Sequence, residues 1–269
     1  MQSRIVASSL ATAVVLTMST IGAISPAVAE DATAEVVAVD VGGLSPAGIS
    51  IIGTGQNLPS MNFPGDWDIG PEAGKQVIAY QVDSAQADKA AVAAAAVQWT
   101  RSWLKRACPG VKPAAVRNCR AMAVFDVDDT LVDDFVVGLR SQPTFTYDPA
   151  VSNQAVATCE APVNEPVRQA YEIFRSWGVA TAIVTGRSQS QQAATMECLG
   201  RLGMSDWDSL TFRPSSSTGP EADYKKAARA GLVDNGWKIG PSIGDQISDM
   251  SYGSLGRGFL LPNVRYYLH

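Results

Sequence analysis

The sequence contains almost no histidine, and its one histidine, His269, is the last of 269 residues. A Ser-His-Asp triad, a histidine-rich zinc site and a phosphohistidine nucleophile are therefore excluded unless this terminus folds back onto a site. Basic residues are also few. The chain has 21 Lys and Arg against 26 Asp and Glu, which gives a net charge of −5, and no Lys/Arg cluster is present. We therefore expect no nucleic-acid partner.

The first 29 residues have the pattern of a signal peptide. Arg4 precedes an apolar run over residues 5–18, and the small-x-small sequence Ala27-Val28-Ala29 follows. The run is short and is interrupted by serines and threonines, which disfavours a membrane anchor. We predict cleavage near Ala29 and a secreted protein with no membrane attachment.

Export makes disulfide bonds the expected state of the four cysteines. No Cys-x-x-Cys pair occurs, so the spacing does not resemble a zinc site. Four cysteines allow three pairings. We favour Cys108–Cys119, which closes a short loop containing Pro and Gly, together with Cys159–Cys198. Free, buried thiols are the alternative.

A short apolar run at residues 121–125 predicts a buried strand of a parallel sheet. Three carboxylates follow it, those of Asp126, Asp128 and Asp129. Asp126 and Asp128 are two residues apart, so on a strand-like backbone both point to one face. Carboxylates at the carboxyl end of such a strand suit a hard cation such as Mg²⁺ and can leave one oxygen free for chemistry.

The acidic stretch has two alternative interpretations. A calcium-binding EF-hand loop is disfavoured, because Leu131 stands where that loop needs Gly and Val137 where it needs Glu. A solvated acidic turn after a strand remains the alternative.

The segments on either side of this stretch predict a divided chain. Residues 30–70 are rich in Gly, Pro and Ser and are interpreted as an extended arm or linker, with a candidate strand at 34–39. Residues 83–107 have helical spacing, with Ser84 as a cap, and predict a helical extension before the first strand. Residues 134–162 hold no long helix by pattern, and we expect a small cap inserted over the strand end.

Two later apolar strands also end in polar residues. The strand at 179–184 leads into Thr185-Gly186-Arg187, and Ser188 with Gln191 resembles a capping box at the start of a helix. A hydroxyl, a glycine and a helix amino terminus together can bind an anion.

The other strand ends in Gly244 and Asp245, with Asp249 shortly after it. Before that strand, a helix starting at Pro220 carries Lys225 and Lys226. The alternation of strands and helices predicts an α/β domain with a mostly parallel sheet.

The order Asp-x-Asp-x-Thr, Thr-Gly-Arg and Gly-Asp-x-x-x-Asp resembles the haloacid dehalogenase (HAD) superfamily of phosphotransferases. Further motifs resemble its subfamily IIIB, the class-B-type acid phosphatases, which include plant vegetative storage proteins: Glu160-Ala161-Pro162, Trp207-Asp208-x-Leu210, Tyr224-Lys225 and Leu261-Pro262-Asn263-x-x-Tyr266-Tyr267. The resemblance covers residues 83–269. It implies a HAD-like Rossmannoid fold, with a domain at 71–269 and its cap at about 134–162.

The resemblance also implies roles for individual residues. Asp126 resembles the nucleophile that forms an aspartyl-phosphate, and Asp128 the general acid and base. Thr185 and Gly186 would bind the phosphate. Lys225 would neutralise it, with Lys226 as the second choice.

A set of four aspartates would supply oxygen ligands to Mg²⁺: Asp126, Asp128 through its backbone carbonyl, Asp245 and Asp249. Asp129 stands where the family commonly has Glu. The implied function is an exported, Mg²⁺-dependent acid phosphatase acting on small phosphomonoesters. A secreted 5′-nucleotidase of the same fold, or a non-catalytic storage or binding protein, are the alternatives.

Overall fold

Strand β3 (Ala121–Phe125) lies inside a six-stranded sheet in which every pair of neighbouring strands is parallel. The computed structural model describes residues 51–53, 67–68, 71–141 and 145–268. The order of the sheet is β1 (Ile51–Gly53), β7 (Arg257–Leu260), β6 (Lys238–Gly244), β3, β4 (Ala180–Ser188) and β5 (Ser209–Arg213). The predicted parallel α/β architecture is confirmed.

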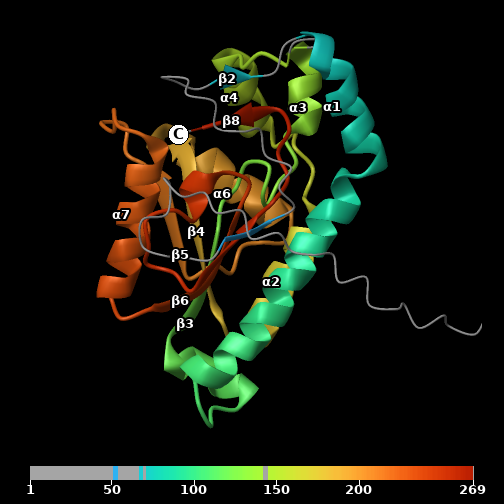
Figure 1. Cartoon of the computed structure of the whole chain (residues 1–269). Helices are drawn as coiled ribbons and strands as arrows, with labels where there is room; N and C mark the ends of the chain where they lie inside the picture. Colours follow the sequence, from blue (N-terminus) through green and yellow to red (C-terminus); the bar gives the residue numbers. More distant parts are fainter. Residues whose placement is uncertain (1–50, 54–66, 69–70, 142–144, 269) are drawn as a thin grey trace, which may run out of the picture. The chain divides into compact units, whose positions relative to one another are not determined.

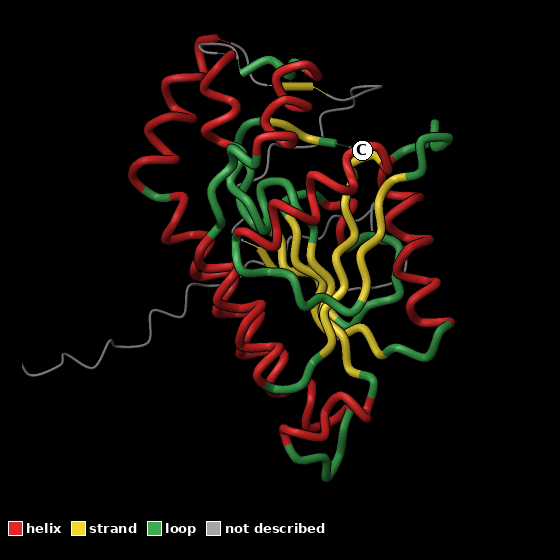
Figure 2. The backbone as a smooth tube through the Cα atoms, turned by 180° about the vertical axis from the view of Figure 1, so that it is seen from behind, coloured by secondary structure: helices red, strands yellow, loops and turns green. Residues whose placement is uncertain are grey.

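The alternation of residues along β3 explains why helices cover both faces of the sheet (Figures 1 and 2). Ala121, Ala123 and Phe125 pack into the larger core, against α2 (Ala85–Ala107) and α5 (Glu165–Ser176). Met122 and Val124 pack into a second core beneath α7 (Glu221–Asp234). A strand buried on both faces needs apolar side chains at every position, and all five residues of β3 are buried.

The segment at residues 30–70 contributes two short strands within the part that the structure describes. One is β1, at the edge of the sheet. The other is β2 (Trp67–Asp68), which pairs antiparallel with β8 (Tyr266–Tyr267) near the chain end. The predicted signal peptide at 1–29 and the candidate strand at 34–39 lie outside the described residues.

The helices before β3 extend further than the sequence patterns indicate. The helix predicted at residues 83–107 is α2, and Ser84 is its N-cap residue without a side-chain hydrogen bond. A further helix, α1 (Pro71–Asp83), precedes it and was not predicted. Among its residues with described side chains, only Gly74 and Val77 are buried up to Tyr80, so it carries little apolar periodicity.

The expected small cap follows β3 and contains α3 (Phe135–Gly138), a 3₁₀ turn η2 (Leu139–Ser141) and α4 (Pro149–Thr158). The expectation of no long helix misses the ten residues of α4. Its start has a clear local cause, because the carboxylate of Asp148 accepts from the backbone N–H of Ala150 at 2.8 Å and Pro149 opens the first turn.

Both favoured disulfides are present, Cys108–Cys119 and Cys159–Cys198. The first closes the turn between α2 and β3. The second joins the residue after α4 to α6 (Gln192–Arg201), and therefore ties the cap to the body of the domain. The predicted capping box of Ser188 and Gln191 also forms, in the 3₁₀ turn η3 (Gln189–Gln191) before α6.

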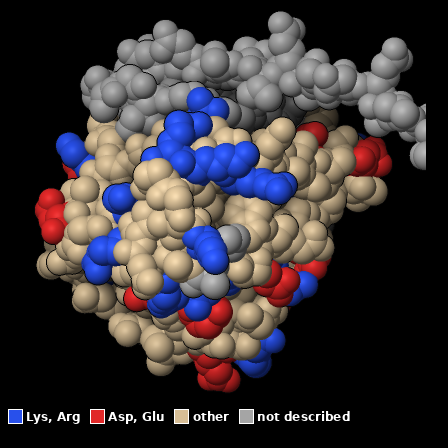
Figure 3. All heavy atoms as spheres, turned by 90° about the horizontal axis from the view of Figure 1, so that it is seen from below, with Lys and Arg blue, Asp and Glu red and all other residues tan. Residues whose placement is uncertain are grey.

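The surface at the carboxyl-terminal end of α2, at the bottom of Figure 1, is basic, although the sequence contains no Lys/Arg cluster. No acidic residue occurs between Lys89 and Phe125. Arg101, Lys105 and Arg106 of α2 are exposed. Figure 3, which views the molecule from this end, shows Lys and Arg side chains gathered on it. Among the described helices, none has both the length and the apolar character needed to cross a bilayer.

The two disulfides should stabilise the protein unequally. Their cysteines are 11 and 39 residues apart, and closure of a longer loop removes more entropy from the unfolded chain, so we expect losses of about 3 and about 4 kcal/mol. Urea unfolding of the C108S/C119S and C159S/C198S variants measures both. A smaller loss in the second variant than in the first would contradict this order.

Candidate active site

Three buried aspartates meet at the carboxyl edge of the sheet. Asp126 follows β3, Asp245 follows the neighbouring strand β6, and Asp249 ends the 3₁₀ turn η4 (Ile247–Asp249). One carboxylate oxygen of each lies within 4.8 Å of the others. The carboxyl ends of adjacent parallel strands share one edge, which is why residues so distant in sequence come together here.

The ammonium group of Lys225 lies against this cluster. Its Nζ is 3.0 Å from Asp126 Oδ1 and 2.5 Å from Asp249 Oδ1. A third carboxylate, that of Glu221 one helical turn earlier on α7, is 2.5 Å from the same Nζ. Glu221 was not among the predicted site residues. Lys226, the second choice, is exposed and lies over the ring of Tyr252.

Two glycines make this packing sterically feasible. A Cβ at Gly244 would lie 2.0 Å from Asp249 Oδ2, and a Cβ at Gly186 would lie 2.6 Å from Glu221 Oε1. Both are closer than any side chain tolerates. Gly244 therefore lets Asp249 reach the cluster, and Gly186 gives Glu221 room to approach Lys225.

The electrostatics of the cluster favour a bound cation. Burial raises the pKa of Asp126 well above its usual range, although Lys225 opposes the shift. Burial likewise raises the pKa of Asp249, and that of Asp245 to about 7. Burial alone would lower the pKa of Lys225, but the surrounding carboxylates raise it well above normal, so Lys225 stays charged. One ammonium cannot neutralise this many buried carboxylates, and a divalent cation with oxygen ligands fits the remaining charge.

The side chain of Asp128 points elsewhere, toward Arg187. Arg187 donates through Nη2 and Nε to Asp128 Oδ1, at 2.6 and 3.0 Å. Burial alone would raise the pKa of Asp128, but Arg187 lowers it below its usual range. The Asp128 carboxylate is therefore not one of the three in the cluster. This leaves the backbone carbonyl of Asp128 as the group that could contact a metal. The pairing with Arg187 was not predicted.

Thr185 is fully buried within β4, where the pairing with β5 changes register, and its Oγ1 accepts from the backbone N–H of Arg187 at 3.2 Å. This leaves the hydroxyl hydrogen for another acceptor.

Arg229 of α7, which is also fully buried and was not predicted, donates to the backbone carbonyls of Ser248 and Asp249 at 3.3 and 2.8 Å. Arg229 thereby holds the loop that presents Asp249.

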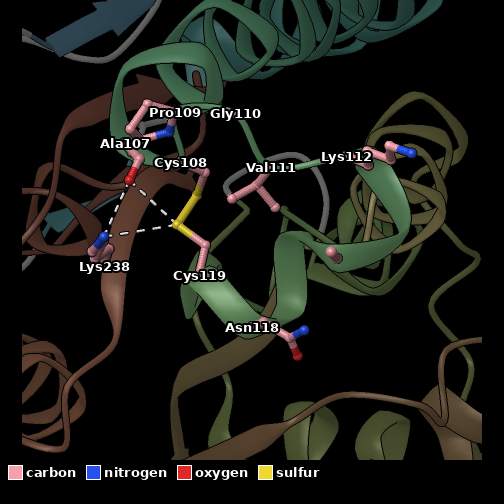
Figure 4. Close-up of a pocket in the computed structure, with 10 residues that line it drawn as sticks. Ala107, Cys108, Pro109, Gly110, Val111, Lys112, Asn118, Cys119 and Lys238 are labelled. Atoms are coloured by element: carbon pink, nitrogen blue, oxygen red, sulfur yellow. Dashed lines mark hydrogen bonds between the residues drawn. A yellow bond between two sulfur atoms is a disulfide. The ribbon is translucent and has the colours of Figure 1, made fainter.

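A cavity of about 570 Å³ lies away from this cluster. Figure 4 shows it around the Cys108–Cys119 disulfide and Lys238, whose Nζ donates to Ala107 O at 3.1 Å. Lys238 begins β6, whereas Asp245 follows its end. The cavity is therefore at the amino end of the sheet, opposite the carboxylate cluster.

Comparison with known proteins agrees with the site. The family model described as "HAD superfamily, subfamily IIIB (Acid phosphatase)" matches residues 58–269. Acid phosphatase 1 of Solanum lycopersicum is 32% identical over 55% of this chain and 60% of its own length. Vegetative storage protein 1 of Arabidopsis thaliana is 29% identical over 54% of each chain. The match thus spans somewhat more than half the length of these curated relatives.

Among solved structures, the class C acid phosphatase from Bacillus anthracis is similar, with a TM-score of 0.56 over 73% of this chain and 87% of that one. Sequence identity is 18%. This similarity shows that the predicted HAD-like fold is correct.

The raised pKa values predict how stability depends on pH when no metal is bound. A carboxyl whose pKa is higher in the folded state adds stability that is complete below its unfolded pKa and is lost as pH rises through the folded value. For Asp245, that value is about 7. We expect the Tm of protein in EDTA to fall between about pH 5 and about pH 7, and Mg²⁺ to reduce that fall. Thermal unfolding followed by circular dichroism measures this.

The matched control for this measurement is Asp245→Asn, which cannot titrate and should show a smaller fall over the same pH range. A Tm in EDTA that rises or stays level in the parent protein would contradict the expectation.

Proposed function

This chain belongs to subfamily IIIB, the acid phosphatases of the HAD superfamily, and we propose that it is an exported, Mg²⁺-dependent enzyme that hydrolyses small phosphomonoesters through an aspartyl-phosphate. The observation that carries the proposal is the contact of the buried Lys225 with Asp126 and Asp249 at the carboxyl edge of the sheet. An ammonium group held there can offset the charge of a phosphate dianion approaching an anionic nucleophile.

In the first step, a carboxylate oxygen of Asp126 attacks phosphorus and the bond from phosphorus to the ester oxygen breaks. The departing oxygen takes a proton from the carboxyl group of Asp128. Lys225 Nζ contacts Asp126 Oδ1, which leaves Oδ2 as the attacking atom. Thr185 would donate its free hydroxyl hydrogen to a phosphoryl oxygen.

In the second step, Asp128, now ionised, removes a proton from water, and the resulting hydroxide attacks the phosphorus of the aspartyl-phosphate. The bond to Asp126 breaks, phosphate leaves and the carboxylate is restored. Arg187 favours the ionised form of Asp128, which is the form this step requires. The first step requires the protonated form, and acid pH favours it.

The residues that would hold Mg²⁺ are Asp126, Asp245 and Asp249 through their carboxylates, and Asp128 through its carbonyl. Bound there, Mg²⁺ would supply positive charge to the phosphoryl oxygens as negative charge develops on them. Arg229 and Gly244 contribute by placing Asp249 in the cluster.

The small cap bears on substrate choice. We propose the cap predicted from the sequence, at about 134–162. The domain predicted at 71–269 also takes in β1, which adds an edge strand to its sheet. A short cap covers little of the strand end, so it leaves space for a bulky leaving group, and a 5′-nucleotidase is the nearest variant of the proposal. Of the aromatic residues in this segment, Phe135 stacks on Phe145 with 6.0 Å between ring centroids, and Tyr147 is 70% exposed.

A storage protein without activity is the second candidate, because relatives of this chain carry that name. Against it stands the complete charged set around Lys225. Buried carboxylates and a buried ammonium are costly to maintain, and a storage role does not need them. Export is supported by the pattern at residues 1–29 and by the two disulfides.

Chelation is the first test of this function. We expect excess EDTA to abolish release of phosphate from an aryl phosphate, and added Mg²⁺ to restore it, because the carboxylate cluster needs a divalent cation to admit a phosphate. Assays over nucleotides and sugar phosphates with the same two treatments identify the preferred substrate. Full activity in EDTA would refute the metal assignment.

Substitution of Asp126 and of Asp128 should impair the reaction at different steps. Asp126→Asn removes the nucleophile, so rapid mixing with an aryl phosphate should show no burst of phenol. Asp128→Asn keeps the nucleophile, and aryl leaving groups need little protonation, so a small burst followed by slow turnover is expected. Each loss of an acid or base role costs about 10²–10⁴ in rate.

Calorimetric titration with Mg²⁺ is the control for both variants, because loss of the metal alone would also inactivate them. If both variants bind Mg²⁺ like the parent and Asp126→Asn still gives a burst, Asp126 is not the nucleophile.

A further inference from the structure

The chain after β7 returns across the carboxyl edge of the sheet and contacts the carboxylate cluster. Asn263, in this returning segment, is 4% exposed. Its Nδ2 donates to Asp245 Oδ2 at 2.7 Å. Asn263 belongs to the motif that carries the resemblance, and no role was predicted for it.

The amide of Asn263 can be oriented in only one way. Its Oδ1 accepts from the backbone N–H groups of Arg265 and Tyr266, at 2.9 and 3.3 Å. An amide oxygen held by two donors fixes the opposite nitrogen toward Asp245. The returning backbone therefore determines which group Asn263 presents to the carboxylate.

A second amide acts on the same oxygen. Gln246 Nε2 donates to Asp245 Oδ2 at 2.7 Å, and Gln246 Oε1 in turn accepts from the backbone N–H of Leu268 at 3.0 Å. The other oxygen, Asp245 Oδ1, has among the described residues only Thr130 Oγ1, at the limiting distance of 3.5 Å. Two donors thus occupy one oxygen of Asp245 and leave the other oxygen for a cation.

The same segment also contacts the turn that carries Asp126 and Asp128. Tyr266 Oη donates to Asp129 Oδ2 at 2.7 Å, and Arg265 pairs with the same carboxylate. Asp129 has a left-handed backbone, with φ of 52°, in that turn. The returning segment therefore contacts Asp245 of the cluster through Asn263, and it contacts the turn that follows Asp126 through Asp129.

We propose that Asn263 is a positioning residue for the cation, acting through Asp245. The proposal rests on the metal assignment of the proposed function. A neutral donor at Oδ2 fixes the rotation of the carboxylate and stabilises its ionised form without competing for the cation, as hydrogen-bonding partners of metal ligands commonly do.

The test is the Mg²⁺ dissociation constant of the full-length protein, measured by titration calorimetry. Asn263→Leu has similar volume and no donor. Asn263→Asp keeps an oxygen that accepts from Arg265 and Tyr266, so the returning segment stays in place, but it presents an oxygen to Asp245. We expect both to bind Mg²⁺ about 10- to 100-fold more weakly. At saturating Mg²⁺, kcat should recover and KM for an aryl phosphate should stay within about twofold of the parent, because positioning acts through the metal.

Tyr266→Phe is the matched control. It lies in the same segment and loses only the hydrogen bond to Asp129, so its Mg²⁺ dissociation constant should stay within about twofold of the parent. Circular dichroism and cooperative unfolding establish whether each Asn263 variant is folded. A folded variant that binds Mg²⁺ as tightly as the parent overturns the proposal. So does failure of both Asn263 variants to fold, since that outcome assigns Asn263 to general stability. Absence of Mg²⁺ binding by the parent itself would refute the metal assignment instead.

Discussion

The ammonium group of Lys225, buried among Asp126, Asp249 and Glu221, is the interaction on which the rest of the site depends. A charge placed in the interior without partners would cost several kcal/mol, so the surrounding structure has to supply carboxylates at close range. Gly186 and Gly244 lack side chains where Glu221 and Asp249 approach. Arg229 binds the carbonyls of the loop that carries Asp249. Each of these features helps to place a carboxylate near Lys225 Nζ or near the cation expected beside it.

Much of this arrangement follows from sequence, for a definite reason. Asp126, Thr185 and Asp245 each follow an apolar run, and parallel strands bring such positions to one edge whatever the lengths of the connections. Gly186 and Gly244 are the chain neighbours of Thr185 and Asp245, in β4 and at the end of β6. The alternation of β3 between two cores follows from the same two-residue period. The resemblance implied Lys225 in preference to Lys226. In the structure, Lys225 is buried and contacts Asp126, whereas Lys226 is exposed.

The contacts that were missed depend on geometry that local patterns do not encode. Arg187 and Asp128 are 59 residues apart, and their pairing depends on how far β3 and β4 extend relative to each other at the carboxyl edge of the sheet. Asn263 reaches Asp245 only because the chain turns back after β7. Glu221 is different, because it stands four residues before Lys225, the spacing at which side chains on one helical face meet. The sequence therefore contained the signal for this pair, because a buried Lys225 needs a carboxylate partner and Glu221 stands on the same helical face.

The opposite behaviour of Asp126 and Asp128 shows how one turn can supply two kinds of carboxyl group. Both follow β3, two residues apart, yet the pKa of Asp126 is raised by burial and that of Asp128 is lowered by Arg187. The difference comes from the cation that each one faces. Lys225 is shared among three carboxylates and only partly offsets the burial of Asp126, whereas Arg187 gives Asp128 Oδ1 two hydrogen bonds. Without a cation, these directions are opposite to what the proposed roles require, because attack needs Asp126 ionised and the first proton transfer needs Asp128 protonated. A divalent cation at the cluster would favour the ionised form of Asp126. The separation arises from side chains on β4 and α7, so the protonation of these two carboxyl groups is set by the assembled sheet edge and not by the acidic turn alone.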